Sequence, residues 1–403
     1  MKVCIINNIY PPYHRGGAEQ VVVKSAQGLV AQGHDVVIIT SAPRGDFSER
    51  HEHTTIYRRR PPNVYFYTDA HKHSGMVRFI WHVCDIFNFS TASWVKNILE
   101  KEKPDIVHTH NLIGLSFFIP SVIRKLGLRH IHTVHDVQLV EPSAMILKDR
   151  EHSWRYTGFP TKIYTWVMKK LMGSPQVVIS PSQFLLDFYT KRGFFPLSKT
   201  VVVRNPLTFD FTLESREQGT GNRKQGNDLF NFLYLGQIET HKGIFLLIEA
   251  FKNIQLDMQK QIHLHIVGNG SQLDEVIEKT KGNVHITVHG RVERDKLPEL
   301  FSRMNVTVVP SLCYENSPTV IFESLFFHIP VLASRIEGIA ELIEEGESGI
   351  TFEAGNVASL AEKMKWAIEH PQDLHIMSNK TTQMLSGLTQ EKYIEKLVSL
   401  YSQ

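Results

Sequence analysis

Two glutamates stand eight residues apart on either side of a Ser-Pro dipeptide. They are Glu315 and Glu323 in the stretch ENSPTVIFE, which lies between the apolar runs VTVVPS and PVLAS. Serine is a favoured N-cap and proline a favoured first residue of a helix. We therefore expect a helix with Ser317 as its N-cap and Pro318 as its first residue, placed between two buried strands.

The expected helix start is suited to binding a phosphate, because the first amides of a helix have no partner within it. The amides concerned belong to Thr319 and Val320. Glu323 would lie about 8 Å further along the axis, roughly the span from a diphosphate to the ribose of one nucleotide. Glu315 would lie on the other side of the phosphates. The alternative is a solvated Glu315 and a Glu323 that neutralises a local cation.

A lysine at a second expected helix start points to the same chemistry. Lys242 follows the run LGQIETH and begins the helical pattern KGIFLLIEAFKNI. A cation at a helix N-terminus opposes the helix dipole and costs stability unless an anion lies close by. A polyphosphate would be such an anion. The alternative is a solvent-exposed lysine.

Glycine-rich turns follow two further expected strands. Gly16 and Gly17 in PPYHRGGAEQ open a helix, where a backbone without side chains lets a phosphate approach closely. The turn VGNG, with Gly268 and Gly270, is a weaker signal. Neither motif is the GxGxxG of nicotinamide cofactors, and no acidic residue follows the second strand at the ribose position. Plain turns are the alternative.

Histidines end two more expected strands, in HTHN (108–111) and HTVHD (132–136). Strand alternation places His108 and His110 on one face. A third metal ligand would have to come from another strand, and no cysteine or acidic cluster supports a metal site. We expect His110 and His135 to form hydrogen bonds to a substrate; a structural role is the alternative.

The strands that precede these motifs belong to two successive α/β repeats. Val/Ile-rich runs alternate with helical patterns, which indicates parallel sheets covered on both faces. Ligands bind beyond the carboxyl ends of such strands, where the motifs lie. The expected strands are residues 2–10, 35–40, 105–110, 130–135, 176–182 and 200–206, then 229–237, 263–270, 285–290, 306–311 and 330–334.

A polar segment at 211–228 separates the two repeats. We predict an N-terminal domain over 1–205 and a C-terminal domain over 206–384. The last helix, about 385–403, is expected to pack back on the first domain. A length of 403 residues suits two such domains.

Composition excludes several classes of protein. Apolar residues make up 42% and charged residues 21%, as in soluble globular proteins. The net charge of +3 comes without a long Lys/Arg run, so no nucleic-acid partner is expected. Three cysteines at unrelated spacings favour a reducing, cytoplasmic compartment. Neither a signal-peptide layout nor an apolar run long enough to span a membrane is present.

In the content and order of its motifs the sequence resembles the retaining glycosyltransferases of family 4, or glycosyl transferases group 1, which have the GT-B fold. The resemblance covers nearly the whole chain except residues 45–100, and the Glu-x7-Glu pair is its most specific part. It implies an α/β fold of two doubly wound Rossmann-like domains facing across a cleft. The motifs are GGAE, HTH, THD, SPSQF, NP, LGQIETHKG, VGNG, ENSPTVIFE, PVLAS and EGIAELIEEGESGI.

The resemblance also implies a role for each motif residue. The catalytic residues would be His135, Lys242 and Glu315. The donor diphosphate would contact Gly16, Gly17, Gln237, Lys242, Thr319 and Val320, and the transferred sugar His135, Glu315, Asn316 and Ser317. The ribose would bind Glu323, and the base would be surrounded by Gly268, Asn269, Gly270 and Arg291. On the acceptor side would lie His110.

The implied reaction moves a sugar from a UDP- or GDP-sugar to a hydroxyl of a glycan or lipid-linked acceptor, with retained configuration. Cell-surface polysaccharide or glycolipid biosynthesis is the implied setting. The chain has no Asp-x-Asp pair to hold a divalent ion on the diphosphate, so we expect neither a cofactor nor a required metal. The alternatives are a catalytically weak nucleotide-sugar-binding or scaffold protein and a sugar-nucleotide epimerase of the same fold.

One position departs from the family pattern. Gln237 stands where the family usually has arginine, which removes a positive charge from the place where the leaving diphosphate gains negative charge. Arg15 and Arg204 are candidates to replace it. This departure is what keeps the scaffold alternative open.

The segment IYTWVMKKLM (163–172) carries Lys169 and Lys170 beside an apolar face. Such a pattern is typical of helices that lie on an anionic membrane, and equally of a core helix with a solvated edge. In the first case the protein would be peripheral on the inner face of the cell membrane, within reach of a lipid-linked acceptor.

Overall fold

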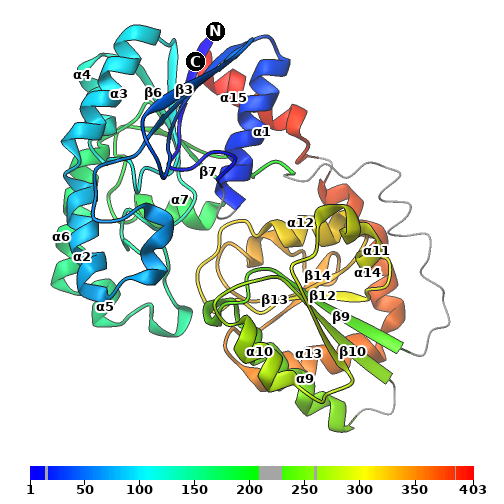
Figure 1. The fold of residues 1–403 in the computed structure, drawn as a ribbon. Coiled ribbons are helices and arrows are strands. Elements are labelled where there is room, and N and C mark those ends of the chain that lie inside the picture. The colour runs from blue at the N-terminus through cyan, green and yellow to red at the C-terminus, as the bar shows by residue number, and fades with distance from the viewer. Residues whose placement is uncertain (14–16, 208–228, 258–260, 386) are drawn as a thin grey trace. The chain divides into compact units, whose positions relative to one another are not determined.

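The computed structural model describes residues 1–13, 17–207, 229–257, 261–385 and 387–403 (Figure 1). The chain divides into two compact units. Unit 1 comprises Met1–Met145, His152–Thr208 and Leu388–Gln403, and unit 2 comprises Ile146–Glu151 and Phe209–Gly387. The short segment Ile146–Glu151 belongs to unit 2, although the residues on both sides of it in the sequence belong to unit 1.

Unit 1 is built on an eight-stranded sheet within the described residues, in the order β3-β4-β2-β1-β5-β6-β7-β8. Its strands pair in parallel except β3, which is antiparallel to β4. The strands are β1 (Lys2–Ile6), β2 (Asp35–Ser41), β3 (Phe47–His51), β4 (Thr54–Arg59), β5 (Ile106–Thr109), β6 (Arg129–Thr133), β7 (Val177–Ser180) and β8 (Lys199–Val202).

The helices of unit 1 lie between its strands along the chain and at its C-terminal end. They are α1 (Gly17–Ala31), α2 (Gly75–Ile86), α3 (Phe89–Glu102), α4 (Ile119–Lys125), α5 (Trp154–Thr157), α6 (Phe159–Met172), α7 (Gln183–Thr190) and α15 (Gln390–Tyr401), with the 3-10 helix η1 (Tyr67–Lys72). The C-terminal α15 lies beside α1 in Figure 1. Its Ile394 and Leu397 share one apolar core with Ile5 and Val22, so the end of the chain completes unit 1.

Unit 2 has a six-stranded sheet within the described residues, in the order β11-β10-β9-β12-β13-β14, and all its pairings are parallel. The strands are β9 (Leu229–Leu235), β10 (Gln261–Val267), β11 (Ile286–Gly290), β12 (Val306–Val309), β13 (Val331–Ser334) and β14 (Gly349–Phe352). Its helices are η2 (Lys148–Arg150), η3 (Thr240–Lys242), α9 (Ile244–Asp257), α10 (Leu273–Thr280), η4 (Arg294–Lys296), α11 (Leu297–Phe301), α12 (Thr319–Phe326), η5 (Ala340–Leu342), α13 (Val357–Glu369) and α14 (Pro371–Leu385).

Both faces of the unit 2 sheet are covered by apolar side chains. Phe232 and Tyr234 of β9 point into a core shared with Phe251 of α9. The intervening Leu233 points into a second cluster with Phe301 of α11. Successive strand residues alternate between faces, so burial on both faces explains why β9 reads as a nearly continuous apolar run.

Backbone hydrogen bonds attach Ile146–Glu151, which we call the strap, to the loop after β12. The Lys148 amide donates to the Leu312 carbonyl at 2.9 Å, and the Tyr314 amide donates to the Ile146 carbonyl at 2.9 Å. Leu147 forms an antiparallel bridge with Cys313. The strap is thus held by unit 2 although it lies within the first half of the sequence.

Among the described residues, none of the helices combines the length and the apolar content required to cross a bilayer.

Candidate active site

The loops that follow β9 and β12 in unit 2 bring a lysine and a glutamate together. The ammonium nitrogen of Lys242 lies 3.0 Å from a carboxylate oxygen of Glu315, and the two side chains are exposed by only 27% and 12%. Burial lowers the pKa of Lys242, but Glu315 and the nearby Cys313 raise it by more, so the net pKa lies above that of a free lysine. Lys242 is therefore a fixed cation at neutral pH.

Close backbone contact holds these two loops in place. Gly243 has a φ of +76°, and a Cβ atom on it would lie 1.8 Å from the carbonyl oxygen of Pro310. The Leu312 amide donates to the His241 carbonyl at 2.9 Å. Gly338 is equally constrained, since its Cβ would lie 2.0 Å from the Glu315 carbonyl. Gly243 therefore lets the loops after β9 and β12 approach closely enough to pair Lys242 with Glu315, and Gly338 lets the loop after β13 approach the backbone of Glu315.

The helix after Glu315 begins one residue later than the sequence suggests. Pro318 is the N-cap of α12 and Thr319 its first residue, and no side chain of the described residues caps it. The expectation that Ser317 caps the helix was wrong, because the Ser317 hydroxyl is buried and bonds to no described group. Without a side-chain cap, the first amides of α12 are still available to a ligand.

Glu323 lies in the second turn of α12 and is buried, with 7% of its side chain exposed. A nitrogen of Arg294 stands 4.0 Å from its carboxylate. Burial raises the pKa of Glu323, and Arg294 offsets only part of that effect. A buried carboxylate with one distant cation is available to take hydroxyl donors.

The strap adds a second charged group beside the same loop. The ammonium of Lys148 lies 3.1 Å from a carboxylate oxygen of Glu151 and also contacts the carboxylate of Glu337. The Tyr314 hydroxyl donates to Glu151. These contacts fasten both the strap and the residue before Gly338 to the neighbourhood of Glu315.

The turn VGNG packs against the loop that carries Gln237. A Cβ on Gly268 would lie 1.8 Å from the Gly236 carbonyl, and one on Gly270 would lie 2.2 Å from the Ile238 carbonyl. The Ile238 amide donates to the Asn269 carbonyl at 3.0 Å. Packing between two loops is thus sufficient to explain both glycines, and their predicted contact with a base stays a prediction.

In unit 1, histidines follow two adjacent strands. Nδ1 of His110 lies 2.9 Å from Nε2 of His135, after β5 and β6 respectively. Burial lowers the pKa of His135 to about 4 and that of His110 well below its usual value. Both rings are neutral at pH 7, so one must donate and the other accept in this hydrogen bond.

The neighbouring histidines His108, His130 and His132 have structural partners. His108 bonds to the Tyr401 hydroxyl of α15 at 2.7 Å and to the Thr133 hydroxyl at 2.7 Å. The Thr109 hydroxyl bonds to His130 at 2.8 Å and to His132 at 2.9 Å. These three rings therefore join β5, β6 and the C-terminal helix.

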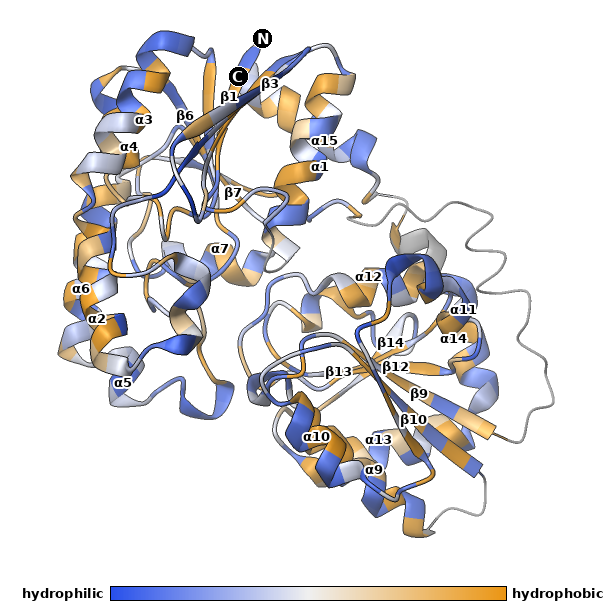
Figure 2. Ribbon diagram, viewed as in Figure 1, coloured by the Kyte–Doolittle hydropathy of each residue, from blue (hydrophilic) through white to orange (hydrophobic). Residues whose placement is uncertain are grey.

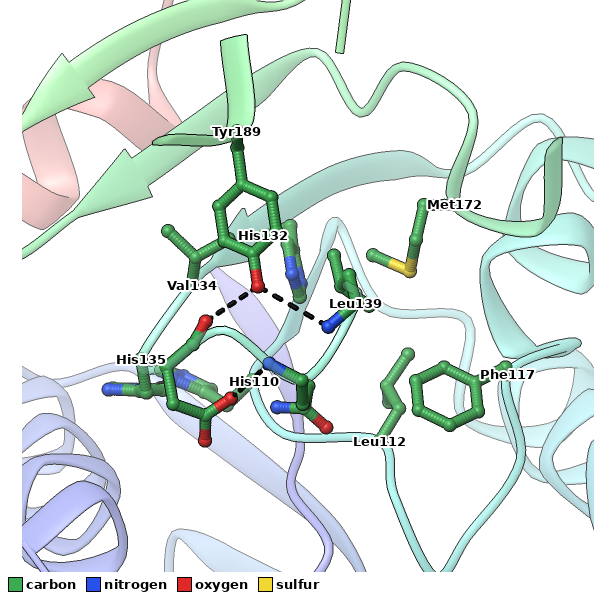
Figure 3. A pocket seen from close by; sticks show the side chains of 11 residues that line it. His110, Leu112, Phe117, His132, Val134, His135, Leu139, Met172 and Tyr189 are labelled. Carbon is green, nitrogen blue, oxygen red and sulfur yellow. Dashed lines mark hydrogen bonds between the residues drawn. The ribbon is translucent and has the colours of Figure 1, made fainter. Parts of the chain in front are cut away.

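A small pocket opens beside the His110–His135 pair (Figure 3). Its apolar wall includes Leu112, Phe117 and Met172, and its polar side is formed by histidines. Figure 3 shows the Tyr189 hydroxyl between two backbone groups, donating to the Asp136 carbonyl at 2.6 Å and accepting from the Leu139 amide at 3.4 Å.

Asp136 lines the same pocket and has an unusual environment. Burial raises its pKa to about 6, and the negative charge of Glu19 near the start of α1 adds to the rise. The amide of Gln138 donates to its carboxylate at 2.8 Å. Glu19 of the GGAE motif is therefore close enough to Asp136 of the THD motif to act on it electrostatically.

Comparisons with known proteins identify the family of this chain. The model of Glycosyltransferase Family 4 matches residues 15–211, and the model of Glycosyl transferases group 1 matches residues 220–384. Together they span nearly all of the chain. The chain belongs to glycosyltransferase family 4. This glycosyltransferase has the GT-B fold predicted from its sequence.

Individual relatives are distant but similar over most of their length. A protein of unknown activity encoded in the cps region of Klebsiella pneumoniae is 25% identical over 85% of this chain and 87% of its own. Sucrose-phosphate synthase from Thermosynechococcus elongatus superimposes with a TM-score of 0.75 at 19% identity, covering 100% of this chain and 98% of that one.

Anabaena HepE has been solved with UDP and with UDP-glucose. The two complexes superimpose on this glycosyltransferase with TM-scores of 0.70 and 0.68 at 16% identity, covering 100% of this chain and 100% and 99% of HepE. At such identities these structures establish the fold and no more.

The site residues predicted for this glycosyltransferase fall in both units. Unit 2 brings together Lys242, Glu315 and the start of α12, with Glu323 further along that helix. Arg291 is exposed and 3.7 Å from Glu293. Unit 1 holds Gly17 at the start of α1, with His110 and His135. Gly16 and Arg15 lie outside the described residues, and Arg204 is an exposed residue after β8.

Sequence reasoning missed two parts of the site. Asp136 was visible in the THD motif, but only the structure reveals the burial that raises its pKa. Lys148 and Glu337 are far apart in sequence and meet only because the strap belongs to unit 2. No periodicity or motif marks the strap.

Proposed function

We propose that this glycosyltransferase moves a sugar from a UDP- or GDP-sugar to a hydroxyl of a glycan or lipid-linked acceptor, with retained anomeric configuration. The observation that carries the proposal is the largely shielded Lys242–Glu315 ion pair, in which Glu315 lies four residues before Thr319, the first residue of α12. An ammonium group has three donors and Glu315 occupies one of them. A diphosphate would accept from the others and from the amides of Thr319 and Val320.

Glu315 also provides the anion that a lysine near a helix start requires. The compensating anion in the absence of donor is the Glu315 carboxylate at 3.0 Å. In the proposed complex the carboxylate orients the ammonium toward the phosphates and turns its second oxygen to hydroxyls of the sugar, together with Asn316 and Ser317. Glu323 would bind the ribose.

The proposed mechanism is departure and attack on the same face of the sugar. A double displacement would need a second carboxylate as nucleophile. We do not assign that role to Asp136, the buried carboxylate of the unit 1 pocket, because it already accepts a hydrogen bond from the Gln138 amide. The leaving diphosphate would instead accept the proton of the acceptor hydroxyl. Lys242 and the α12 amides would stabilise the charge of the leaving group, so no metal ion is required and a chelator should leave turnover unchanged.

The acceptor would approach from unit 1, where His110 and His135 lie beside an apolar pocket. Neutral histidines suit hydrogen bonding to sugar hydroxyls rather than binding of charge. The Klebsiella relative from a cps region and the complexes of HepE with UDP and UDP-glucose support a nucleotide-sugar donor and a polysaccharide setting.

A donor screen tests the proposal. Purified protein is incubated with UDP- and GDP-sugars, and released nucleoside diphosphate is measured with and without glycan or lipid-linked acceptors. Release stimulated by an acceptor, with an α-linked product from an α-linked donor by NMR, is the expected result. Tight donor binding without release would favour the scaffold alternative, and a changed sugar on an intact nucleotide would favour the epimerase.

A further inference from the structure

Helix α2 of unit 1 exposes apolar side chains along one stripe. Met76, Phe79, Ile80, Val83 and the following Phe87 recur at the spacing of one helix face, and Met76 and Phe79 are 71% and 64% exposed. The opposite side of α2 is anchored. The Trp81 indole donates to the Tyr65 carbonyl at 2.8 Å, and buried Asp85 accepts from the Gly114 amide. The apolar stripe therefore faces solvent because the helix is fixed by its other side.

Helix α6 likewise exposes apolar side chains along one stripe. Phe159, Ile163 and Trp166 form its exposed stripe, with Phe159 and Trp166 exposed by 72% and 59%. Met168 and Met172 are its buried residues. An ordinary surface helix places its polar residues on the exposed side. Two helices that expose apolar residues instead indicate an interaction surface.

The two helices are neighbours in unit 1. Asp85 of α2 acts electrostatically on Tyr164 of α6, whose hydroxyl donates to the Gln138 carbonyl at 2.8 Å. Figure 1 shows both helices along the same side of the unit, and Figure 2 shows apolar residues on each of them. We call their exposed stripes together the α2–α6 face.

The charges beside this face have a single sign. Residues 74–90 and 153–172 contain Arg78, Arg155, Lys162, Lys169 and Lys170, and their one acidic residue is the buried Asp85. Lys162 and Lys170 are exposed on the same side of α6 as Trp166. Apolar side chains rimmed by cations match a bilayer surface with anionic headgroups.

A second copy of the chain suits the face less well. A twofold interface brings the same patch of both subunits together, so the cations of one copy would meet those of the other. Like charges across an interface oppose association. We propose that the α2–α6 face docks this glycosyltransferase on anionic membrane lipid, with the aromatic side chains inserted at the headgroup level and the lysines against lipid phosphates. This inference goes beyond the proposed function and requires neither its donor nor its acceptor.

Vesicle binding tests the proposal. Full-length protein is sedimented with vesicles of phosphatidylcholine alone or mixed with phosphatidylglycerol, at low and high salt. We expect binding to the mixed vesicles that weakens at high salt. The double variant Phe79→Ser/Trp166→Ser should bind about tenfold or more weakly, and Lys162→Glu/Lys170→Glu should lose the preference for phosphatidylglycerol. Tryptophan emission should shift to the blue on binding, since Trp154 and Trp166 are exposed.

The matched control is Leu197→Ser/Val284→Ser, which removes two apolar side chains exposed by 87% and 82% outside the face. It should bind vesicles as the wild type does. Equal losses in both double variants, or a wild type that stays in solution with mixed vesicles at low salt, would overturn the proposal. A different result would also overturn it: the wild type is a dimer in sedimentation velocity, the Phe79→Ser/Trp166→Ser variant is a monomer, and neither binds vesicles. Donor turnover with a soluble acceptor, measured in parallel, reports separately on the proposed reaction.

Discussion

The ammonium of Lys242 and the carboxylate of Glu315, on loops after two different strands, are 3.0 Å apart and mostly shielded from solvent. The pair combines a permanent positive charge with a group that orients it. If a diphosphate leaves beside it, the charge acts where the transition state needs it and no reorganisation is required.

Replacing Lys242 with alanine should lower kcat by about a hundredfold or more, because one preorganised donor to the leaving group is lost. The measurement is steady-state release of nucleoside diphosphate with acceptor present. Lys252→Ala is the control, since Lys252 bonds only to a backbone carbonyl of the described residues on the surface of the same unit. Wild-type-like turnover in Lys242→Ala would remove the basis of the proposed mechanism.

Glu315→Gln should move the alkaline limit of kcat/KM to lower pH. Burial lowers the pKa of Lys242, and Glu315 is the larger of the influences that raise it. Without that carboxylate the lysine loses its proton at lower pH, and its charge disappears. A pH–rate profile of the variant measures the shift. An unchanged alkaline limit would mean that the ion pair does not control the lysine.

Gln237→Arg should strengthen binding of nucleoside diphosphate by about tenfold, since a hydrogen bond to a charged group contributes about 1.5–3 kcal/mol. Gln237 follows Gly236 in the loop after β9, where the Tyr234 hydroxyl fixes the Gln237 carbonyl at 2.6 Å. Isothermal titration with UDP and GDP gives the affinity. Gln272→Arg, further along the same unit, controls for added charge, and equal effects in both variants would show that position 237 is not special.

Gly243→Ala should unfold the protein more easily than Gly282→Ala. The two glycines have φ values of +76° and +78°, so the conformational cost of alanine is alike at about 1 kcal/mol. A Cβ on Gly282 meets nothing within 4 Å, whereas one on Gly243 would lie 1.8 Å from Pro310. We expect a total loss of about 3 kcal/mol or more for Gly243→Ala. Urea denaturation measures both, and equal losses would contradict the close loop contact.

Acid should destabilise unit 1 through its buried histidines. Burial lowers the pKa of His108 and His132 to about 3 and of His135 to about 4. A depressed pKa gives stability that is present above the unfolded value of 6.5 and is lost as pH falls through the folded value. For His135 alone the loss is about 3 kcal/mol.

The raised pKa of Asp136, about 6, acts in the opposite sense and offsets part of this loss as the pH falls below 6. Urea denaturation between pH 7 and pH 4 follows the balance. His135→Gln should flatten the acid limb, and His53→Gln, at an exposed position, should leave it unchanged. The same slope in both variants would count against a neutral buried His135.

Alternation of buried strands with helices was sufficient to predict two doubly wound domains. It worked because strands such as β9 are buried on both faces and so are continuously apolar. The β3–β4 hairpin was missed, since FSERH in β3 is almost wholly exposed and carries no apolar pattern. The start of α12 was misplaced by one residue, since Pro318 occupies the N-cap position and the buried Ser317 hydroxyl forms no capping hydrogen bond.

Side-chain pairings between distant segments could not be predicted from the sequence. The Lys242–Glu315 pair depends on glycine contacts between two loops, and the Lys148–Glu337 contact depends on which unit holds the strap. Neither leaves a local pattern. The exposed stripe of α6 was visible in sequence as an apolar face beside lysines, but whether that face was core or surface required its neighbours.

The strap and α15 together decide when this protein can finish folding during synthesis. Unit 1 needs residues 388–403, whose Tyr401 bonds to His108, so the first half of the chain waits for the last residues to be translated. The strap is made early but has no partner until the loop around Cys313 follows. Neither unit can therefore be obtained by a single cut, and fragments intended to fold alone should carry a transplanted α15 or strap.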